Sequence, residues 1–296
     1  MSKQEKTKSL ISDQYKRKSL FVESWLRIRT NPGAVFGLVI IIIIILMMFY
    51  SIFFISFRDV TRFVGPRLQP PSSQYWFGLD EMGRDLFLRM VYGSRYSLAV
   101  GFGSVGFGLI VGTFFGAIAG FFGPTVENII MRIADVLSSI PAILLGMVIV
   151  AVLGPSLMNL ILAIAISNVS GFVRMGRAAI LAQAGDEYVE SSKAIGMSEF
   201  RTLFTQVLPN SISPLIVTAT MRMGTAVLSA AGLSFLGFGV PVPHPEWGAI
   251  INGGRQYMLV APHVTFYPGI FIMAITFGCA LLGDGLRDAL DPRLKK

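Results

Sequence analysis

Long tracts without a single charged residue constrain the fold of this 296-residue chain more than any other feature. No Asp, Glu, Lys or Arg occurs in 30–57, 96–126 or 136–173. A helix needs about 20 apolar residues to cross the hydrocarbon core of a bilayer, and each tract is long enough. Charged residues make up 14% of the chain, against roughly 25% in a typical soluble protein. The sequence therefore predicts an all-α polytopic membrane protein.

Six transmembrane helices are expected from these tracts and from two further apolar stretches near the C-terminus. The tract 136–173 is too long for one crossing, and the Leu-Gly-Pro-Ser stretch at 153–156 predicts a tight hairpin inside it. The spans are expected at 35–57, 96–126, the two halves of 136–173, 212–236 and 264–282.

The distribution of basic residues predicts the orientation of these spans. An even number of crossings places both chain ends on one side of the membrane, and that side carries most of the 25 Lys and Arg residues. Because cytoplasmic segments are enriched in Lys and Arg, we expect both termini in the cytoplasm. The basic excess flanks the spans, so nucleic acid is not an expected partner.

The predicted segments are a cytoplasmic N-terminal tail (1–34), span one (35–57), an extracytoplasmic segment with an interfacial helix (58–95), a core of five spans (96–285) with a polar loop at 182–210 and an outer loop at 237–263, and a cytoplasmic C-terminal tail (286–296).

The polar loop has the pattern of two short helices joined at a glycine. Within 186–210, Asp186 suits a helix N-terminus, where a carboxylate meets the positive end of the helix dipole. Gly196 ends or bends the first helix, Ser198 is placed to cap the second, and Pro209 stops it before span five. Such a charged pair of helices is either a docking surface for a partner protein or a solvated connector.

The spacing within this loop resembles the EAA loop of bacterial ABC-importer permeases. Glu-Ser-Ser at 190–192 is followed after three residues by Gly196, and Leu-Pro at 208–209 begins twelve residues later. The blocks "GLDEMGRDLFLRMVYGSRYSL", "LSFLGFGV", "EWGAIINGGRQY" and "LLGDGLRDALDPRL" are similar to the OppC/DppC-like peptide permeases, a group that includes nickel permeases. The resemblance covers nearly the whole chain.

The resemblance implies a type I ABC importer permease fold and a transport subunit that is not an enzyme. The implied partners are a second, OppB/DppB-like permease in a heterodimer, two cytosolic ATPase subunits and an extracytoplasmic substrate-binding protein. ATP and Mg would be bound by the ATPases, so no cofactor is expected in this chain. The implied cargo is an oligopeptide or dipeptide, with nickel or a metal chelate as the alternative. The implied ATPase-coupling residues are Glu187, Glu190, Ser191, Ser192, Lys193, Ala194, Ile195, Gly196, Met197, Leu208 and Pro209.

Motifs absent from the sequence bear on how such a transporter is powered. The chain lacks the Gly-x-x-x-x-Gly-Lys phosphate loop, and the predicted spans contain no Asp or Glu for relaying protons or binding sodium. An ion-coupled secondary transporter is therefore the weaker alternative. One cysteine and two histidines predict neither a disulfide nor a metal site, and no catalytic signature supports an enzyme.

Arg222 is the one charge inside a predicted span. An arginine within a membrane usually faces a protein interior or a water-filled cavity. It is a candidate for the translocation pathway, where it could attract a substrate carboxylate. The alternative is an arginine that packs helices together through backbone carbonyls or a partner's acidic side chain.

Two outer segments carry further candidates. Leu86, Phe87, Met90 and Val91 share one helical face, which predicts a helix lying at the outer interface, for membrane anchoring or for docking of the binding protein. The outer loop 237–263 is rich in Pro, Gly and aromatic residues and is either a gate, a contact for the binding protein or a packed loop. Its candidate residues are Glu246, Trp247 and Arg255.

Overall fold

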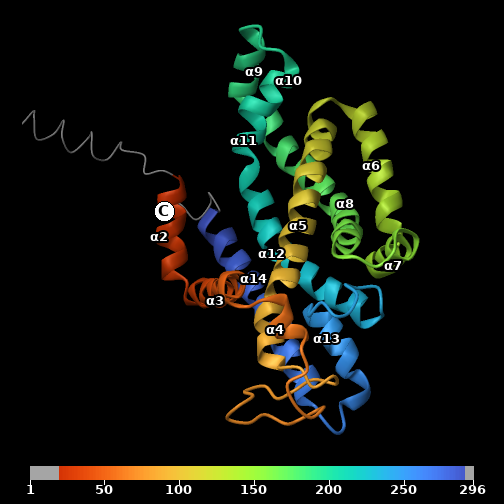
Figure 1. The fold of residues 1–296 in the computed structure, drawn as a ribbon. Helices are drawn as coiled ribbons and strands as arrows, with labels where there is room; N and C mark the ends of the chain where they lie inside the picture. The colour runs from red at the N-terminus through yellow and green to blue at the C-terminus, as the bar shows by residue number, and fades with distance from the viewer. Residues whose placement is uncertain (1–19, 291–296) are drawn as a thin grey trace, which may run out of the picture.

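A computed structural model describes residues 20–290, and most of this range is helical (Figure 1). Within it the only β pairing is an isolated bridge between Leu79 and Asp85. The helices are α2 (Leu20–Thr30), α3 (Pro32–Phe54), α4 (Phe57–Thr61), α5 (Leu86–Phe121), α6 (Pro124–Ser139), α7 (Ala142–Leu153), α8 (Leu157–Ala184), α9 (Glu187–Ala194), α10 (Glu199–Thr202), the π-helix η1 (Leu203–Val207), α11 (Leu208–Asn210), α12 (Ile212–Phe235), α13 (Trp247–Gly254), the 3₁₀-helix η2 (Arg255–Tyr257) and α14 (His263–Leu290).

Five of these helices, α3, α5, α8, α12 and α14, are long and apolar enough to cross a membrane. The third predicted span is not one long helix. Its place is taken by α6 and α7, which form a pair of shorter helices bent by 86°. The bend lies at Pro141, which disfavours helical backbone at Ile140, and Ile140 is extended with φ −92° and ψ 127°. The predicted count of six is reached only if this bent pair is one span. The predicted turn at 153–156 does separate α7 from α8, with Gly154 at φ +86°.

The interfacial helix predicted in 58–95 is wrong as a separate element. Helix α5 runs without a break from Leu86 to Phe121, so the proposed boundary at residue 95 falls inside it. The face assigned to the membrane interface is instead part of the protein interior, since Leu86 and Met90 are fully buried. An apolar helical face has the same sequence pattern whether it meets lipid or protein.

Helices α5 and α8 approach each other along a strip of glycines. A Cβ added at Gly112 would lie 2.4 Å from that of Phe172, and one at Gly116 would lie 2.5 Å from the carbonyl oxygen of Val173. Both distances are shorter than any real Cβ contact, so only glycine permits this approach. Gly112, Gly116 and Gly120 recur every four residues and so form a strip of small residues along α5, which lets the two helices approach closely.

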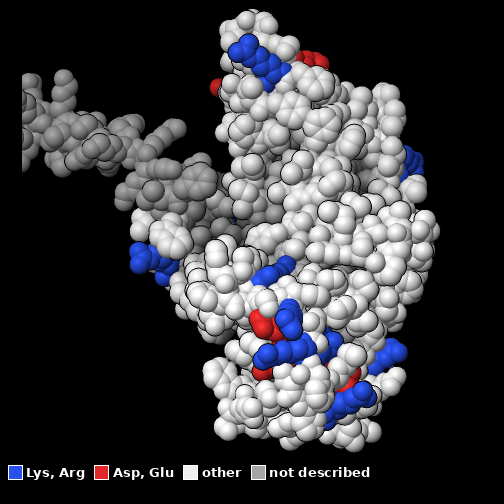
Figure 2. Space-filling view, in the orientation of Figure 1, with Lys and Arg blue, Asp and Glu red and all other residues white. Residues whose placement is uncertain are grey.

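The two ends of the molecule carry different elements (Figure 1). Helices α9 and α10 project at one end, beyond the tips of α5 and α8, whereas α13 and the chain preceding α5 lie at the other. On the face in Figure 2, Lys, Arg, Asp and Glu gather towards both ends, and the surface between them is largely uncharged. This distribution suits a protein whose middle lies in lipid.

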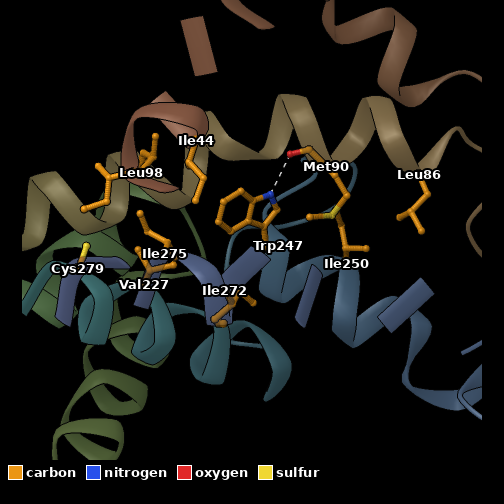
Figure 3. Close-up of a cluster of buried hydrophobic side chains, with 12 residues drawn as sticks. Ile44, Leu86, Met90, Leu98, Val227, Trp247, Ile250, Ile272, Ile275 and Cys279 are labelled. Atoms are coloured by element: carbon orange, nitrogen blue, oxygen red, sulfur yellow. Dashed lines mark hydrogen bonds between the residues drawn. The ribbon is translucent and has the colours of Figure 1, made fainter. Parts of the chain in front are cut away.

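The core at the α13 end is built around Trp247 (Figure 3). Its indole is fully buried, and Nε1 donates a hydrogen bond to the carbonyl oxygen of Met90 at 3.0 Å. Ile44 from α3, Val227 from α12 and Ile275 from α14 belong to the same cluster. Three consecutive helices near the C-terminus, α12, α13 and α14, are thereby held in one core with α3 and α5 from the N-terminal half.

The predicted tails are partly structured. Residues 20–30, assigned to the N-terminal tail, form α2, in which Ile28 is buried beside Ala34 and Ala289. The last helix continues to Leu290, past the expected end of span six at residue 282. The remainder of the expected tails, 1–19 and 291–296, lies outside the described residues.

Candidate functional site

The polar loop 182–210 folds as the two short helical segments that the sequence predicts. Helix α9 follows Asp186 and ends at Ala194, and after the capping residue Ile195 the chain turns at Gly196, which has φ +84°. This left-handed conformation suits glycine, because a Cβ is disfavoured there. Ser198 does precede α10, but its hydroxyl makes no capping hydrogen bond. The chain then continues through η1 and α11 into α12, with only a turn at Ser211 between them. The predicted stop at Pro209 is therefore wrong, because Pro209 lies within α11, in the first turn, where a proline is tolerated.

The inner side of this loop is fastened to the tips of α5 and α8. Val189, Leu203 and Val207 are buried with Ala117 and Ile180 in one apolar cluster. Around this cluster the Phe204 ring stacks on Phe114 at 5.8 Å, and Phe200 contacts Phe122 at 5.1 Å. The Lys193 ammonium lies 5.1 Å from the Phe121 ring. Because one side of the loop is packed in this way, a force on the loop reaches both long helices.

The outer side of the loop is exposed and carries charges without ionic partners. Glu187, Glu190 and Lys193 are exposed, and none of them forms an ion pair among residues 20–290. Ile195, at the tip, is 79% exposed. The outer side of the loop therefore combines exposed charges with one strongly exposed apolar side chain. The other predicted coupling residues divide into exposed Ser191, Ala194, Gly196 and Pro209 and half-buried Ser192, Met197 and Leu208.

Arg222 lies near the middle of α12 and faces α8. Its Nη1 donates a hydrogen bond to Oδ1 of Asn168 at 2.9 Å, and its guanidinium lies 5.3 Å from the Phe172 ring centre. It borders a hollow of about 200 Å³ whose polar lining includes Ser167 and Ser229. It also borders a second hollow of about 260 Å³, which Arg174 and Ser167 line. The predicted pathway residue therefore lies in the contact between α8 and α12 and also borders open space, so both roles considered for it stay open.

Glu246 and Trp247, which were predicted as outer contact residues, lie in the protein interior. Both are fully buried, which contradicts a role as surface contacts for another protein. The Glu246 carboxylate caps α13 by accepting hydrogen bonds from the backbone N–H groups of Gly248 and Ala249 at 3.0 and 2.9 Å. Burial raises the pKa of this carboxyl above its ordinary value. The sequence does not show that Glu246 is buried and caps α13, because a capping Glu and a surface Glu have the same sequence pattern.

Arg255 is the one of these three residues that remains accessible. Its side chain is exposed, and the guanidinium lies 5.9 Å from the Phe235 ring centre. It lines an outer hollow of about 460 Å³ together with Glu81 and Tyr257.

A family model described as "binding-protein-dependent transport system inner membrane component" matches residues 112–296 of this chain. The chain belongs to this family. A second model, the N-terminal transmembrane domain of oligopeptide transport permease C, matches residues 19–71. The predicted recognition as an ABC-importer permease subunit is confirmed.

Individual relatives extend the match over nearly the whole permease. The dipeptide transport system permease protein DppC of Alkalihalophilus pseudofirmus is 44% identical over 96% of this chain and 93% of its own length. The glutathione transport system permease protein GsiD of Pectobacterium atrosepticum is 44% identical over 76% of this chain and 75% of its own. The di/tripeptide permease DppC of Pseudomonas aeruginosa is 39% identical over 92% of both.

The permease fold is also found among solved structures. An inward-facing MetNI methionine ABC transporter chain aligns with a TM-score of 0.57 and 21% identity, covering 69% of this chain and 97% of that one. At this identity the likeness concerns the fold alone. The predicted type I ABC importer permease fold is confirmed.

One buried cluster of charges escaped the sequence reasoning. The Asp80 carboxylate pairs with the Arg84 guanidinium at 2.6 Å and with that of Arg89 at 3.1 Å, and all three side chains are at most 3% exposed. Arg89 also donates to the carbonyl oxygen of Val60 at 3.0 Å. The cluster ties the outer segment of the permease to α5. An Asp followed by Arg four residues later was the available signal, but that spacing also occurs in exposed pairs.

Metal ligands are not grouped in the described part of the permease. Within residues 20–290 no three or more His, Cys, Asp and Glu side chains are placed to hold a metal ion.

Proposed function

We propose that this permease imports peptides, with dipeptides and other short oligopeptides as its cargo. The observation that carries the proposal is the 44% identity, over 96% of the chain, to a protein named as a dipeptide permease. Two further relatives are named for di/tripeptide and glutathione transport. The hollow beside Arg222 supports the same class of cargo, because every unmodified peptide offers a carboxylate that an arginine can bind.

The loop formed by α9, α10, η1 and α11 docks on a cytosolic ATPase subunit in this proposal. Support comes from its exposed charges and exposed Ile195, which lie opposite a side packed on α5 and α8. A motor that binds the loop in one conformation more tightly than in the other shifts the permease between inward-facing and outward-facing states. ATP and Mg are held by the motor in this scheme, and this chain supplies no cofactor site.

The remaining partners follow the same scheme. The permease pairs with a second, OppB/DppB-like permease and receives its cargo from an extracytoplasmic binding protein. Both termini and the loop lie in the cytoplasm of a bacterial cell, and the chain crosses the cell membrane several times. Of the three outer residues predicted from sequence, exposed Arg255 is the one placed to touch the binding protein.

Reconstitution of the complete importer in liposomes tests this function. With the second permease, the ATPases and the binding protein present, we expect ATP-dependent accumulation of a radiolabelled dipeptide. Uptake should be unchanged when proton and sodium gradients are collapsed, since the power comes from ATP. Uptake of nickel in place of the dipeptide would contradict the cargo, and uptake without ATP would contradict the mechanism.

A further inference from the structure

Three residues of α8 form a fitted seat for Arg222. Gly171 and Phe172 lie three and four residues after Asn168, so both neighbour it on one side of the helix. Asn168 accepts a hydrogen bond from the Arg222 guanidinium. The guanidinium carbon lies 5.3 Å from the centre of the Phe172 ring. The side chain of an arginine in the middle of a span is thereby held in one direction.

The glycine in this seat leaves free the space that the guanidinium occupies. A Cβ added at Gly171 would lie 2.2 Å from Nη2 of Arg222 and 2.7 Å from its Cζ. The guanidinium therefore occupies the space where any other residue would place its side chain. Even alanine would displace the guanidinium while leaving its charge unchanged.

The charge of Arg222 is not balanced by an acidic side chain. Arg84, Arg89, Arg174 and Arg177 each pair with Asp or Glu, whereas in residues 20–290 no carboxylate lies within ion-pair distance of Arg222. Its one hydrogen bond to a side chain goes to a neutral amide. A guanidinium has five N–H donors, so donors remain available on a cation that is partly removed from water.

Among the described residues of this chain, no acidic side chain lines the space in front of these donors. The two hollows that Arg222 borders are lined by apolar residues, serines, Thr225, Asn168 and a second cation, Arg174. The hydroxyls of Thr225 and Ser229 donate to backbone carbonyls of their own helix. In such a site an incoming carboxylate would be the first negative charge that Arg222 meets.

The geometry points to a carboxylate-binding subsite in which Arg222, seated by Asn168, Gly171 and Phe172, binds the free C-terminal carboxylate of the cargo. Arg222 contacts the cargo, and the three α8 residues are positioning residues. The subsite makes the permease itself select cargo with a free carboxylate, in addition to any selection by the binding protein. This inference rests on the proposed peptide function.

A single near-isosteric substitution separates this role from a purely structural one. Asn168→Asp places a carboxylate where the amide oxygen now lies, 2.9 Å from Nη1 of Arg222. If Arg222 only packs α12 against α8, the new ion pair keeps that contact, and transport is unchanged. If Arg222 binds cargo, the new carboxylate occupies and neutralises it.

The measurement is uptake of dialanine and of dialanine amide by the reconstituted importer, each at a concentration that saturates the binding protein. We expect Asn168→Asp to lower dialanine uptake by about tenfold or more, the effect of losing one charge-assisted hydrogen bond. Amide uptake should stay within about twofold of wild type. The same binding protein delivers both peptides to every variant, so its own preference cancels when variant and wild type are compared.

A glycine pair gives a matched control that keeps every charge. Gly171→Ala displaces the guanidinium and should lower dialanine uptake in the same direction. Gly106→Ala on α5 is the control, because a Cβ there meets no atom within 4 Å. Arg222→Gln should reproduce the loss, and the thermal unfolding midpoint of each purified permease pair verifies assembly.

The outcomes separate failure of the subsite from failure of the function. Dialanine uptake by Asn168→Asp equal to wild type overturns the subsite, as does an equal fall for dialanine and its amide. In either case wild-type ATP-dependent uptake leaves the peptide function intact. If the wild-type importer takes up neither peptide, the proposed function falls, and the subsite falls with it.

Discussion

The coupling loop and the outer segment in front of α5 are both rich in charge but use it in opposite ways. In the loop, Glu187, Glu190 and Lys193 are exposed to solvent and form no ion pairs within residues 20–290. In the outer segment, Asp80 is buried between two arginines, with side-chain exposures of 1–3%. Charged residues therefore remain exposed to solvent in the coupling loop, whereas in the outer segment they form buried ion pairs that hold the chain in place.

This difference has an energetic consequence. Exposed charges contribute little to stability because water solvates them in the folded and unfolded chain alike. Removing one partner from a buried ion pair leaves an uncompensated charge in a low-dielectric interior, which is strongly destabilising. Substitutions in the two regions should thus separate stability from transport.

Asp80→Ala should have the largest effect. It strands the buried guanidinium groups of Arg84 and Arg89, so we expect the free energy of unfolding to fall by about 3–5 kcal/mol. Denaturant titration of the purified permease in detergent measures this. A loss below about 1 kcal/mol would show that water reaches the cluster and that the contrast between the two regions is weaker than the burial indicates.

Trp247→Phe should have the next largest effect. It removes the hydrogen bond from the indole Nε1 to the Met90 carbonyl and part of a fully buried ring. The expected loss is about 2 kcal/mol, from the hydrogen bond and the volume together. The same titration checks it. If peptide uptake fell while stability was unchanged, Trp247 would have a direct role in transport that its burial does not suggest.

Glu246→Gln should change how stability depends on pH. Burial raises the pKa of Glu246 in the folded protein, so the folded state holds this proton more tightly than the unfolded state does. Wild-type stability should then decline as pH rises above the unfolded value of about 4.5 and through the folded pKa. Glutamine keeps one oxygen to cap α13 and carries no proton to lose. Unfolding midpoints measured from pH 4 to pH 8 should decline less in the variant, and parallel profiles would contradict the assignment.

Gly196→Ala should have a small effect on stability and a larger one on transport. Its φ of +84° disfavours a side chain by about 1 kcal/mol, although the space around it is open. We expect a reorientation of α9 relative to α10 and lower ATP-dependent uptake. Gly196→Trp should remove uptake altogether while the long helices stay folded, as judged by circular dichroism. Normal coupled uptake in the tryptophan variant would count against docking at this loop.

Glu190→Lys should have the smallest effect on stability, within about 0.5 kcal/mol, because the side chain is exposed. We nevertheless expect ATP hydrolysis to become uncoupled from uptake, since the charge presented to the motor is reversed. Parallel assays of ATPase activity and peptide uptake measure this, with Glu190→Gln as the milder variant. If ATP hydrolysis and uptake stayed fully coupled, the result would contradict docking of the ATPase at this surface and favour a solvated connector.

Much of the fold could be predicted from the sequence because the lipid bilayer imposes long uncharged helices. The spans at α3, α12 and α14, the glycine strip on α5 and the turn at Gly196 all follow from local rules of length, charge and backbone freedom. The family resemblance likewise rests on short blocks in a set order. The bend at Pro141 was foreseeable in principle, but the long apolar tract around it concealed the break between α6 and α7.

Burial decided what local patterns could not. Nothing in the sequence distinguishes Glu246 and Trp247, which lie in the interior, from the exposed Arg255 in the same loop. The seat for Arg222 joins α8 and α12, whose contacting residues are distant in sequence. The ion cluster of Asp80 joins residues that are close in sequence, but their burial depends on how the rest of the chain packs around them. Lipid exposure is set by each helix alone and can be read along the chain. Contacts between helices depend on how all of them pack, so only the tertiary structure determines which polar groups meet.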